Sequence, residues 1–177
     1  MTSTDILNFW FSKENKKKWF VKDKDFDSLI TEIFLNTYNQ AANGGLDNWK
    51  ETSEGLLSLI IILDQFPRNM FRDQAQSFAM DAKALSLAKE AIVKRIDKQL
   101  MLEQQRFIYM PFMHSENLED QNISVELFTN DEISYSYAIR HREIIQRFGR
   151  FPHRNILLGR ESTQEEIEFL KTPNSSF

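Results

Sequence analysis

The sequence predicts an all-α protein built from antiparallel helical hairpins, with about eight or nine helices in a single domain over residues 1–177. Apolar residues recur at helical spacing along most of the chain, and no alternating apolar–polar run of strand length is present. Only five glycines and four prolines occur in 177 residues, so turns should be few and helices long.

Nine segments carry the helical period or its boundary signals. Helices are expected over residues 4–12, 25–42, 54–65, 81–96, 100–111, 118–129, 132–148, 152–158 and 163–170. Gly44 and Gly149 have the residue type that commonly ends a helix, and Pro152 suits a first helical turn. The stretch Ser-Thr-Gln-Glu-Glu at residues 162–166 offers a capping box for the last helix, and residues 170–177 should form a loose tail.

Composition and charge exclude several classes of protein. A net charge of −4 argues against non-specific nucleic-acid binding by the whole molecule. The absence of cysteine excludes disulfides and cysteine nucleophiles and fits a reducing compartment. The N-terminus has no secretory pattern, and the longest apolar stretch is shorter than the roughly 18 residues of a membrane span. We therefore expect a cytoplasmic protein without a nucleic-acid partner, and the sequence carries no signal about oligomeric state.

A lysine-rich stretch at residues 13–24 leaves two interpretations open. Lysines flanked by aromatic residues are typical of a surface that contacts anionic membranes. The favoured interpretation is a solvated loop anchored by Trp19 and Phe20, because nearby acids dilute the positive charge. A membrane partner is accordingly not favoured.

The most apolar run of the chain, residues 56–63, leads into a polar corner with the sequence Asp-Gln-Phe-Pro-Arg-Asn. This run should be buried on nearly all sides, and Pro67 should end the helix near Gln65. A buried carboxylate at Asp64 would then need a cationic partner, with Arg68 and Arg72 nearest in the chain. A structural ion pair and the wall of a pocket both fit this pattern.

A second corner, Arg-Phe-Gly-Arg-Phe-Pro-His-Arg-Asn at residues 147–155, lies in the most basic part of the chain. Residues 140–160 contain six arginines and two histidines against one acid, Glu143. Arginine presents a planar fork that suits carboxylates and phosphates. The residues expected to bind an anion are Gln65, Arg68, Arg142, Arg150, His153 and Arg154. The alternative is that the six arginines of residues 140–160 form ion pairs with acids, namely Asp64, Glu116, Glu119, Asp120 and Glu143.

Four residues are candidates for acid–base chemistry: Asp64, His114, Glu116 and His141. His141 shares a stripe with apolar residues, where a hydrogen-bonded core histidine is the commoner outcome. No histidine spacing matches a known metal motif such as His-Glu-x-x-His, and no glycine-rich phosphate loop is present. We therefore expect neither a metal nor a cofactor.

Four long segments resemble a large, chiefly bacterial family of uncharacterised proteins, a domain of unknown function. They are LIIILDQFPRNMFR, SFAMDAKALSLAKEAI, YMPFMHSENLEDQ and RHREIIQRFGRFPHRNILLGRES. The resemblance implies an all-helical, tetratricopeptide-like fold and implies no activity. The family commonly has a small residue after the position of Arg72, where this chain has Asp73.

Two functions remain open at this stage. The first is a helical binding or scaffold domain whose arginine- and histidine-lined cleft holds a small anion or a peptide carboxylate. The alternative is a hydrolase- or lyase-type enzyme that acts on a small anionic substrate through the four acid–base candidates.

Overall fold

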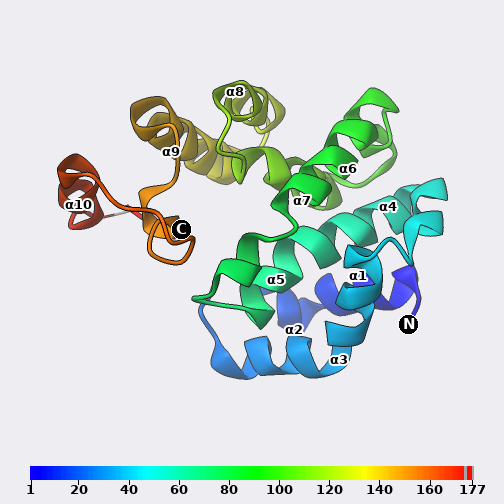
Figure 1. The fold of residues 1–177 in the computed structure, drawn as a ribbon. Helices are drawn as coiled ribbons and strands as arrows, with labels where there is room; N and C mark the ends of the chain where they lie inside the picture. Colours follow the sequence, from blue (N-terminus) through cyan, green and yellow to red (C-terminus); the bar gives the residue numbers. More distant parts are fainter. Residues whose placement is uncertain (174, 177) are drawn as a thin grey trace. The chain divides into compact units, whose positions relative to one another are not determined.

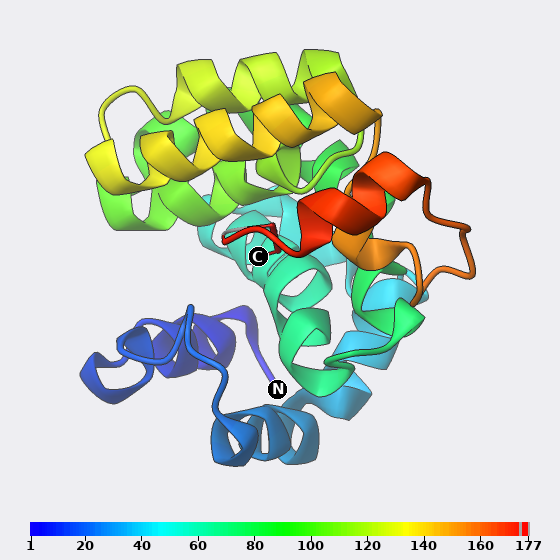
Figure 2. The same ribbon diagram turned by 90° about the vertical axis from the view of Figure 1, so that its left-hand side faces the viewer.

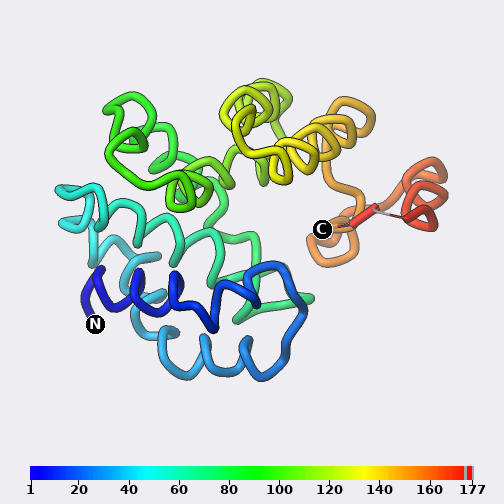
Figure 3. Tube along the Cα trace, turned by 180° about the vertical axis from the view of Figure 1, so that it is seen from behind, coloured from blue at the N-terminus to red at the C-terminus, as the bar shows by residue number. Residues whose placement is uncertain are grey.

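A computed structural model describes residues 1–173 and 175–176, and within these residues the chain is helical without a β-strand (Figures 1 and 3). The α-helices are α1 (Ser3–Trp10), α2 (Lys13–Lys16), α3 (Lys24–Ala42), α4 (Ser53–Ile60), α5 (Phe66–Met70), α6 (Asp81–Val93), α7 (Leu102–Met113), α8 (Leu118–Leu127), α9 (Glu132–Phe148) and α10 (Gln164–Leu170). Apart from the short α2 and α5, these correspond to eight of the nine expected helices, whereas the helix predicted over residues 152–158 is only a 3₁₀ turn, Pro152–Arg154. The all-α prediction is confirmed.

The chain forms two compact units, and each is described by itself. Unit 1 comprises Met1–Arg72 and Gln76–Pro111, and unit 2 comprises Asp73–Ala75 and Phe112–Phe177. The single-domain organisation and the tetratricopeptide-like arrangement stay predictions. The expected loose tail falls partly on residues 174 and 177, which lie outside the described residues.

An aromatic core stabilises unit 1. Trp10 of α1 lies within 5.6 Å of the rings of both Phe66 and Phe107, measured between ring centroids. Trp19 packs edge-on against Phe107, and its indole N–H donates to the carbonyl of Trp10 over 2.9 Å. Helix α1 packs on α4 (Figure 3). The apolar residues of α4 are almost completely buried, as the sequence predicts for the run at residues 56–63. Among the described residues, no helix has the length and apolar character needed to cross a membrane.

The helix that contains Asp64 does not end at Gln65, which corrects the sequence prediction. A π-helical turn, Ile61–Gln65, joins α4 to α5, so the chain stays helical as far as Met70. The N–H of Phe66 donates to the carbonyl of Ile61, five residues earlier. This wider turn changes the hydrogen-bond register just before Pro67, which has no N–H and is tolerated in the first turn of α5.

The lysine-rich stretch also differs in part from its prediction. It contains the single-turn helix α2 followed by turns, and Trp19 is buried as expected. Phe20 does not anchor the loop, because 63% of its surface is exposed. The indole of Trp19 packs against the rings of Trp10 and Phe107.

In unit 2, α8 and α9 form a hairpin whose helices lie side by side (Figure 2). Asp131 caps α9 by accepting from the N–H of Ser134, and Gly149 ends α9 with a φ of 67°. A short 3₁₀ turn, Pro152–Arg154, follows, and the chain then leads to α10. The predicted capping box at Thr163 and Glu166 is present.

Candidate functional site

The first polar corner forms an ion-pair group within unit 1. Asp64 is fully buried, accepts a 2.6 Å hydrogen bond from the Gln65 side chain and lies 3.5 Å from the guanidinium of Arg68. Arg68 also binds both carboxylate oxygens of Asp81, at 2.9 and 3.1 Å. Burial opposes the charge of Arg68, but Asp81 and Asp64 together raise its pKa above the ordinary value. This geometry fits the structural ion pair that the sequence left open.

A second group joins α5 to α3 in the same unit. Arg72 donates two 2.6 Å hydrogen bonds to Asp27, and the amide of Asn69 donates a third at 2.8 Å. An open hollow of about 350 Å³ lies here. Its lining residues are Asp27, Ser28, Thr31, Glu32, Asn69 and Met70. None of the predicted catalytic or ligand-binding residues lines this hollow.

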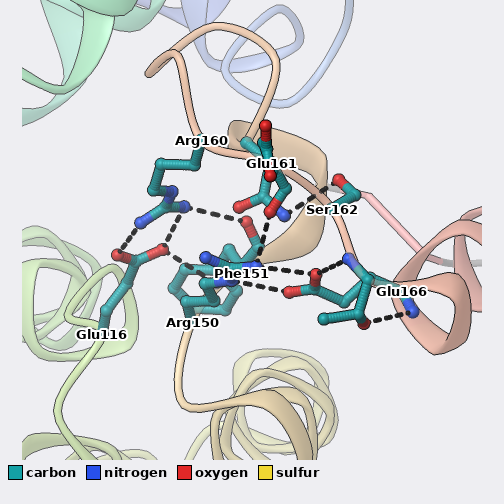
Figure 4. A network of polar contacts seen from close by, with 9 residues as sticks. Glu116, Arg150, Phe151, Arg160, Glu161, Ser162 and Glu166 are labelled. Carbon is teal, nitrogen blue, oxygen red and sulfur yellow. Dashed lines mark hydrogen bonds and ion pairs between the residues drawn. The ribbon is translucent and has the colours of Figure 1, made fainter.

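Arg150 and Glu166 form a two-point ion pair in unit 2 (Figure 4). The two hydrogen bonds measure 2.6 and 2.8 Å, and Arg150 donates a further one to the carbonyl of Glu161. Hydrogen bonding from Arg150 lowers the pKa of Glu166 to about 2, against the opposing effect of burial. The sequence did not identify this pairing, because Glu166 was assigned only to the capping box.

Glu116 and Arg160 form a second two-point ion pair, at 2.6 and 2.9 Å (Figure 4). Glu116 also accepts from the backbone N–H of Phe151, and Arg160 donates to the carbonyl of the same residue. Burial favours the neutral form of Glu116, but the hydrogen bonds from Arg160 and Phe151 outweigh it, and its pKa lies below the ordinary value. Of the acids proposed as partners for the basic region, Glu116 is confirmed as one.

His141 is buried within α9 and stays neutral. Its Nδ1 lies 2.8 Å from the carbonyl oxygen of Tyr137, which can only accept, so Nδ1 carries the proton and Nε2 is the acceptor nitrogen. The pKa of His141 falls to about 3, chiefly because of burial; the hydrogen bond to the Tyr137 carbonyl opposes this fall, and electrostatic interactions with His114, Arg154 and His153 add to it. We call these four residues, His114, His141, His153 and Arg154, the basic cluster.

The ring of Phe151 lies among three members of the basic cluster. The guanidinium carbon of Arg154 stands 4.5 Å from the centroid of the ring, and His141 and His153 lie at 5.6 and 5.7 Å. Phe151 is fully buried, and only 6% of Arg154 is exposed. The backbone of Phe151 thus binds Glu116 and Arg160, while its ring supports Arg154.

The predicted site residues belong to both units. Unit 1 contains Asp64, Gln65 and Arg68, and unit 2 contains His114, Glu116, His141, Arg142, Arg150, His153 and Arg154. The residues that sequence reasoning missed are Asp81, Phe151, Arg160 and Glu166, although Arg160 was counted in the basic region. Within the described part of the chain, no three histidine or acidic side chains are placed to share a metal ion.

The pKa values of His141 and Glu116 do not suit proton transfer near neutral pH. A general base works best with a pKa near the operating pH, whereas that of His141 is about 3. Glu116 is held as a carboxylate by Arg160 and so is a poor proton donor. Buried cationic and N–H-bearing side chains, in contrast, are the groups that bind carboxylates and phosphates.

Comparison with known proteins gives the family. A family model described as "Bacterial protein of unknown function (DUF924)" matches residues 6–174. The chain belongs to this family. A solved structure of a protein of unknown function from Agrobacterium tumefaciens, ATU0120, is 40% identical, with a TM-score of 0.92 over 96% of each chain. No curated protein matches. The resemblance seen in the sequence is therefore confirmed, and neither comparison names an activity.

Proposed function

We propose that this DUF924 protein is a binding module whose unit 2 holds a small anion, or the carboxylate of a peptide, at the basic cluster. The observation that carries the proposal is that Arg154 and His141 are buried together around the ring of Phe151, with His153 beside the same ring. Glu116 and Glu166 bind Arg160 and Arg150 through two hydrogen bonds each, and Glu116 also interacts electrostatically with Arg154.

The electrostatics favour a negative ligand. In a low-dielectric interior, the charge of Arg154 adds to the effect of burial in disfavouring the protonation of His141. A bound anion would oppose this field and would accept hydrogen bonds from guanidinium and imidazole N–H groups. Arg142, the residue after His141 in α9, has a buried Nε–H without a hydrogen-bond partner within the described residues.

Three predicted ligand-binding residues fall outside this proposal. Arg150 is held by Glu166 and by the carbonyl of Glu161, which directs its fork away from a ligand. Gln65 and Arg68 bind Asp64 and Asp81 in unit 1. We do not propose the acid–base enzyme, because Glu116 and His141 are held in protonation states that suit proton transfer poorly.

A thermal-shift screen tests the proposal with phosphate, sulfate, acetate, dicarboxylates and short peptides with a C-terminal carboxylate. A ligand at about 100 times its Kd adds roughly 2.7 kcal/mol to the free energy of unfolding. We expect one class of anion to raise the Tm of the wild type and to lose that effect in Arg154→Lys and His153→Gln. Lysine keeps the charge of Arg154 but not its planar fork.

Arg147→Gln is the matched control. Arg147 lies in the same basic stretch, but half of its side chain is exposed and it pairs with the exposed Glu165. This variant should keep the full anion response. A screen without any stabilising anion, or a response that survives in both Arg154→Lys and His153→Gln, would show that the basic cluster is not a binding site.

A further inference from the structure

The turn that follows α2 exposes two consecutive apolar side chains. Phe20 is 63% exposed and Val21 is 54% exposed. The preceding residue, Trp19, is fixed in the core by its hydrogen bond to the carbonyl of Trp10 and by its ring contact with Phe107. Phe20 and Val21 therefore lie at a tip that is held firmly by its neighbour.

Lysines surround this tip. Residues 13–25 contain six lysines and three acids, a net charge of +3, so the remaining residues of a chain with net charge −4 carry −7. Lys16 pairs with Glu103, and Lys18 pairs with Asp23. Lys17 and Lys24 are exposed on either side of the apolar pair. The positive charge is thus concentrated where the apolar side chains emerge.

We propose that this tip, Phe20 and Val21 with Lys17 and Lys24, docks reversibly on an anionic lipid bilayer. A bilayer offers an apolar layer directly beneath a negative surface, which is the combination that this tip complements. Peptide recognition generally uses a groove or a sheet edge. Phe20 and Val21 are instead each more than half exposed, which suits insertion into a bilayer surface better than the binding of a peptide.

The exposure of Phe20 is the observation that separates the two interpretations of the lysine-rich stretch. The solvated loop required Phe20 to anchor the chain, and the structure assigns that role to Trp19 alone. A docked tip would require no membrane-spanning helix. Two apolar side chains and a few lysines predict weak, salt-sensitive binding, because each lysine near an anionic surface contributes about a fivefold increase in affinity.

Co-sedimentation of the full chain with lipid vesicles tests this proposal. Vesicles of phosphatidylcholine with phosphatidylglycerol are compared with vesicles of phosphatidylcholine alone, at low and high salt. We expect binding to the anionic vesicles at low salt and its loss at high salt. The double variant Phe20→Ser/Val21→Ser should weaken binding about tenfold or more, and Lys17→Gln/Lys24→Gln about 25-fold.

Matched controls change similar groups elsewhere. Val93→Ser removes an apolar side chain that is 84% exposed, and Lys94→Gln/Lys171→Gln removes two surface charges. Both controls should bind like the wild type. Absence of wild-type binding, or equal binding by the tip variants, would overturn the proposal. A wild-type dimer that Phe20→Ser/Val21→Ser converts to monomer would also overturn it, by showing that a second copy covers the tip.

Discussion

Replacing Glu166 by glutamine tests the ion pair that fixes α10. Only 2% of Glu166 is exposed, and it receives two hydrogen bonds from Arg150. Glutamine keeps a side-chain oxygen for the capping box at Thr163, so the substitution removes mainly the charge. The variant therefore isolates the contribution of the buried carboxylate.

The pKa of Glu166 sets an upper bound on that contribution. A fall from 4.5 to about 2 corresponds to roughly 3 kcal/mol at neutral pH, at 1.36 kcal/mol per pKa unit. The Arg150 side chain is 28% exposed, so solvent screening reduces this figure, and we expect a loss of about 1–2 kcal/mol. For a chain of this length the Tm should fall by about 2–8 °C.

Chemical denaturation of the wild type, Glu166→Gln and the neighbouring Glu165→Gln provides the assay. Glu165 is 63% exposed and pairs with an exposed arginine, so its substitution should cost no more than about 0.5 kcal/mol. Because the folded-state pKa of Glu166 is lowered, its stabilisation is complete above pH 4.5 and is lost as the pH falls toward 2. Equal losses for the two variants, or a Glu166→Gln deficit that persists unchanged at pH 2, would refute the reasoning.

Three further predictions address other charged groups. The pKa of His141 is about 3 in the folded chain against an ordinary value of 6.5, so the free energy of unfolding should fall as the pH drops from 6.5 toward 4.5. The fall should be smaller in His141→Gln. Urea titrations of both proteins across this pH range measure the difference. Glu116→Gln should destabilise the chain by about 1–3 kcal/mol, because Arg160 loses its charged partner. The same variant should tighten anion binding several-fold, because it removes a negative charge that interacts with Arg154. Calorimetric titration with the best anion shows whether the affinity rises or falls. Arg68→Gln should lower the free energy of unfolding by about 3–5 kcal/mol, because the fully buried Asp64 would lose the cation of Arg68. Melting followed by circular dichroism measures the change in Tm. A smaller fall in Tm for Arg68→Gln than for Arg147→Gln would contradict this prediction.

The sequence predicted the elements better than the contacts between them. The apolar period of residues 25–42 and 132–148 located α3 and α9 closely, because that period records which face of a helix is buried. The need of Asp64 for a cation also followed from burial alone, and Arg68 supplies it. The π-helical turn before Pro67 could not be predicted, since a proline normally indicates a helix end.

The pairing of charges was predictable in kind and not in detail. Counting charges placed a surplus of arginine near residue 150, but several acids at large sequence separation were equally able to neutralise it. Arg160 binds Glu116, one of the acids named from the sequence, whereas Arg150 binds Glu166 of α10. Only the tertiary structure brings Glu166 to Arg150, and its local role in the capping box concealed the second partner.

The two Phe-Pro motifs place similar residues in opposite electrostatic surroundings. After Pro67, Arg68 binds Asp81 and lies beside Asp64, so its charge is matched by two carboxylates within unit 1. After Pro152, Arg154 packs on Phe151, interacts electrostatically with Glu116 and lies close enough to His141 to help depress its pKa. The same motif chemistry therefore stabilises a helix junction in the first case. In the second case the role that we propose is anion binding, so the anion screen with Arg154→Lys tests function, whereas Arg68→Gln tests stability.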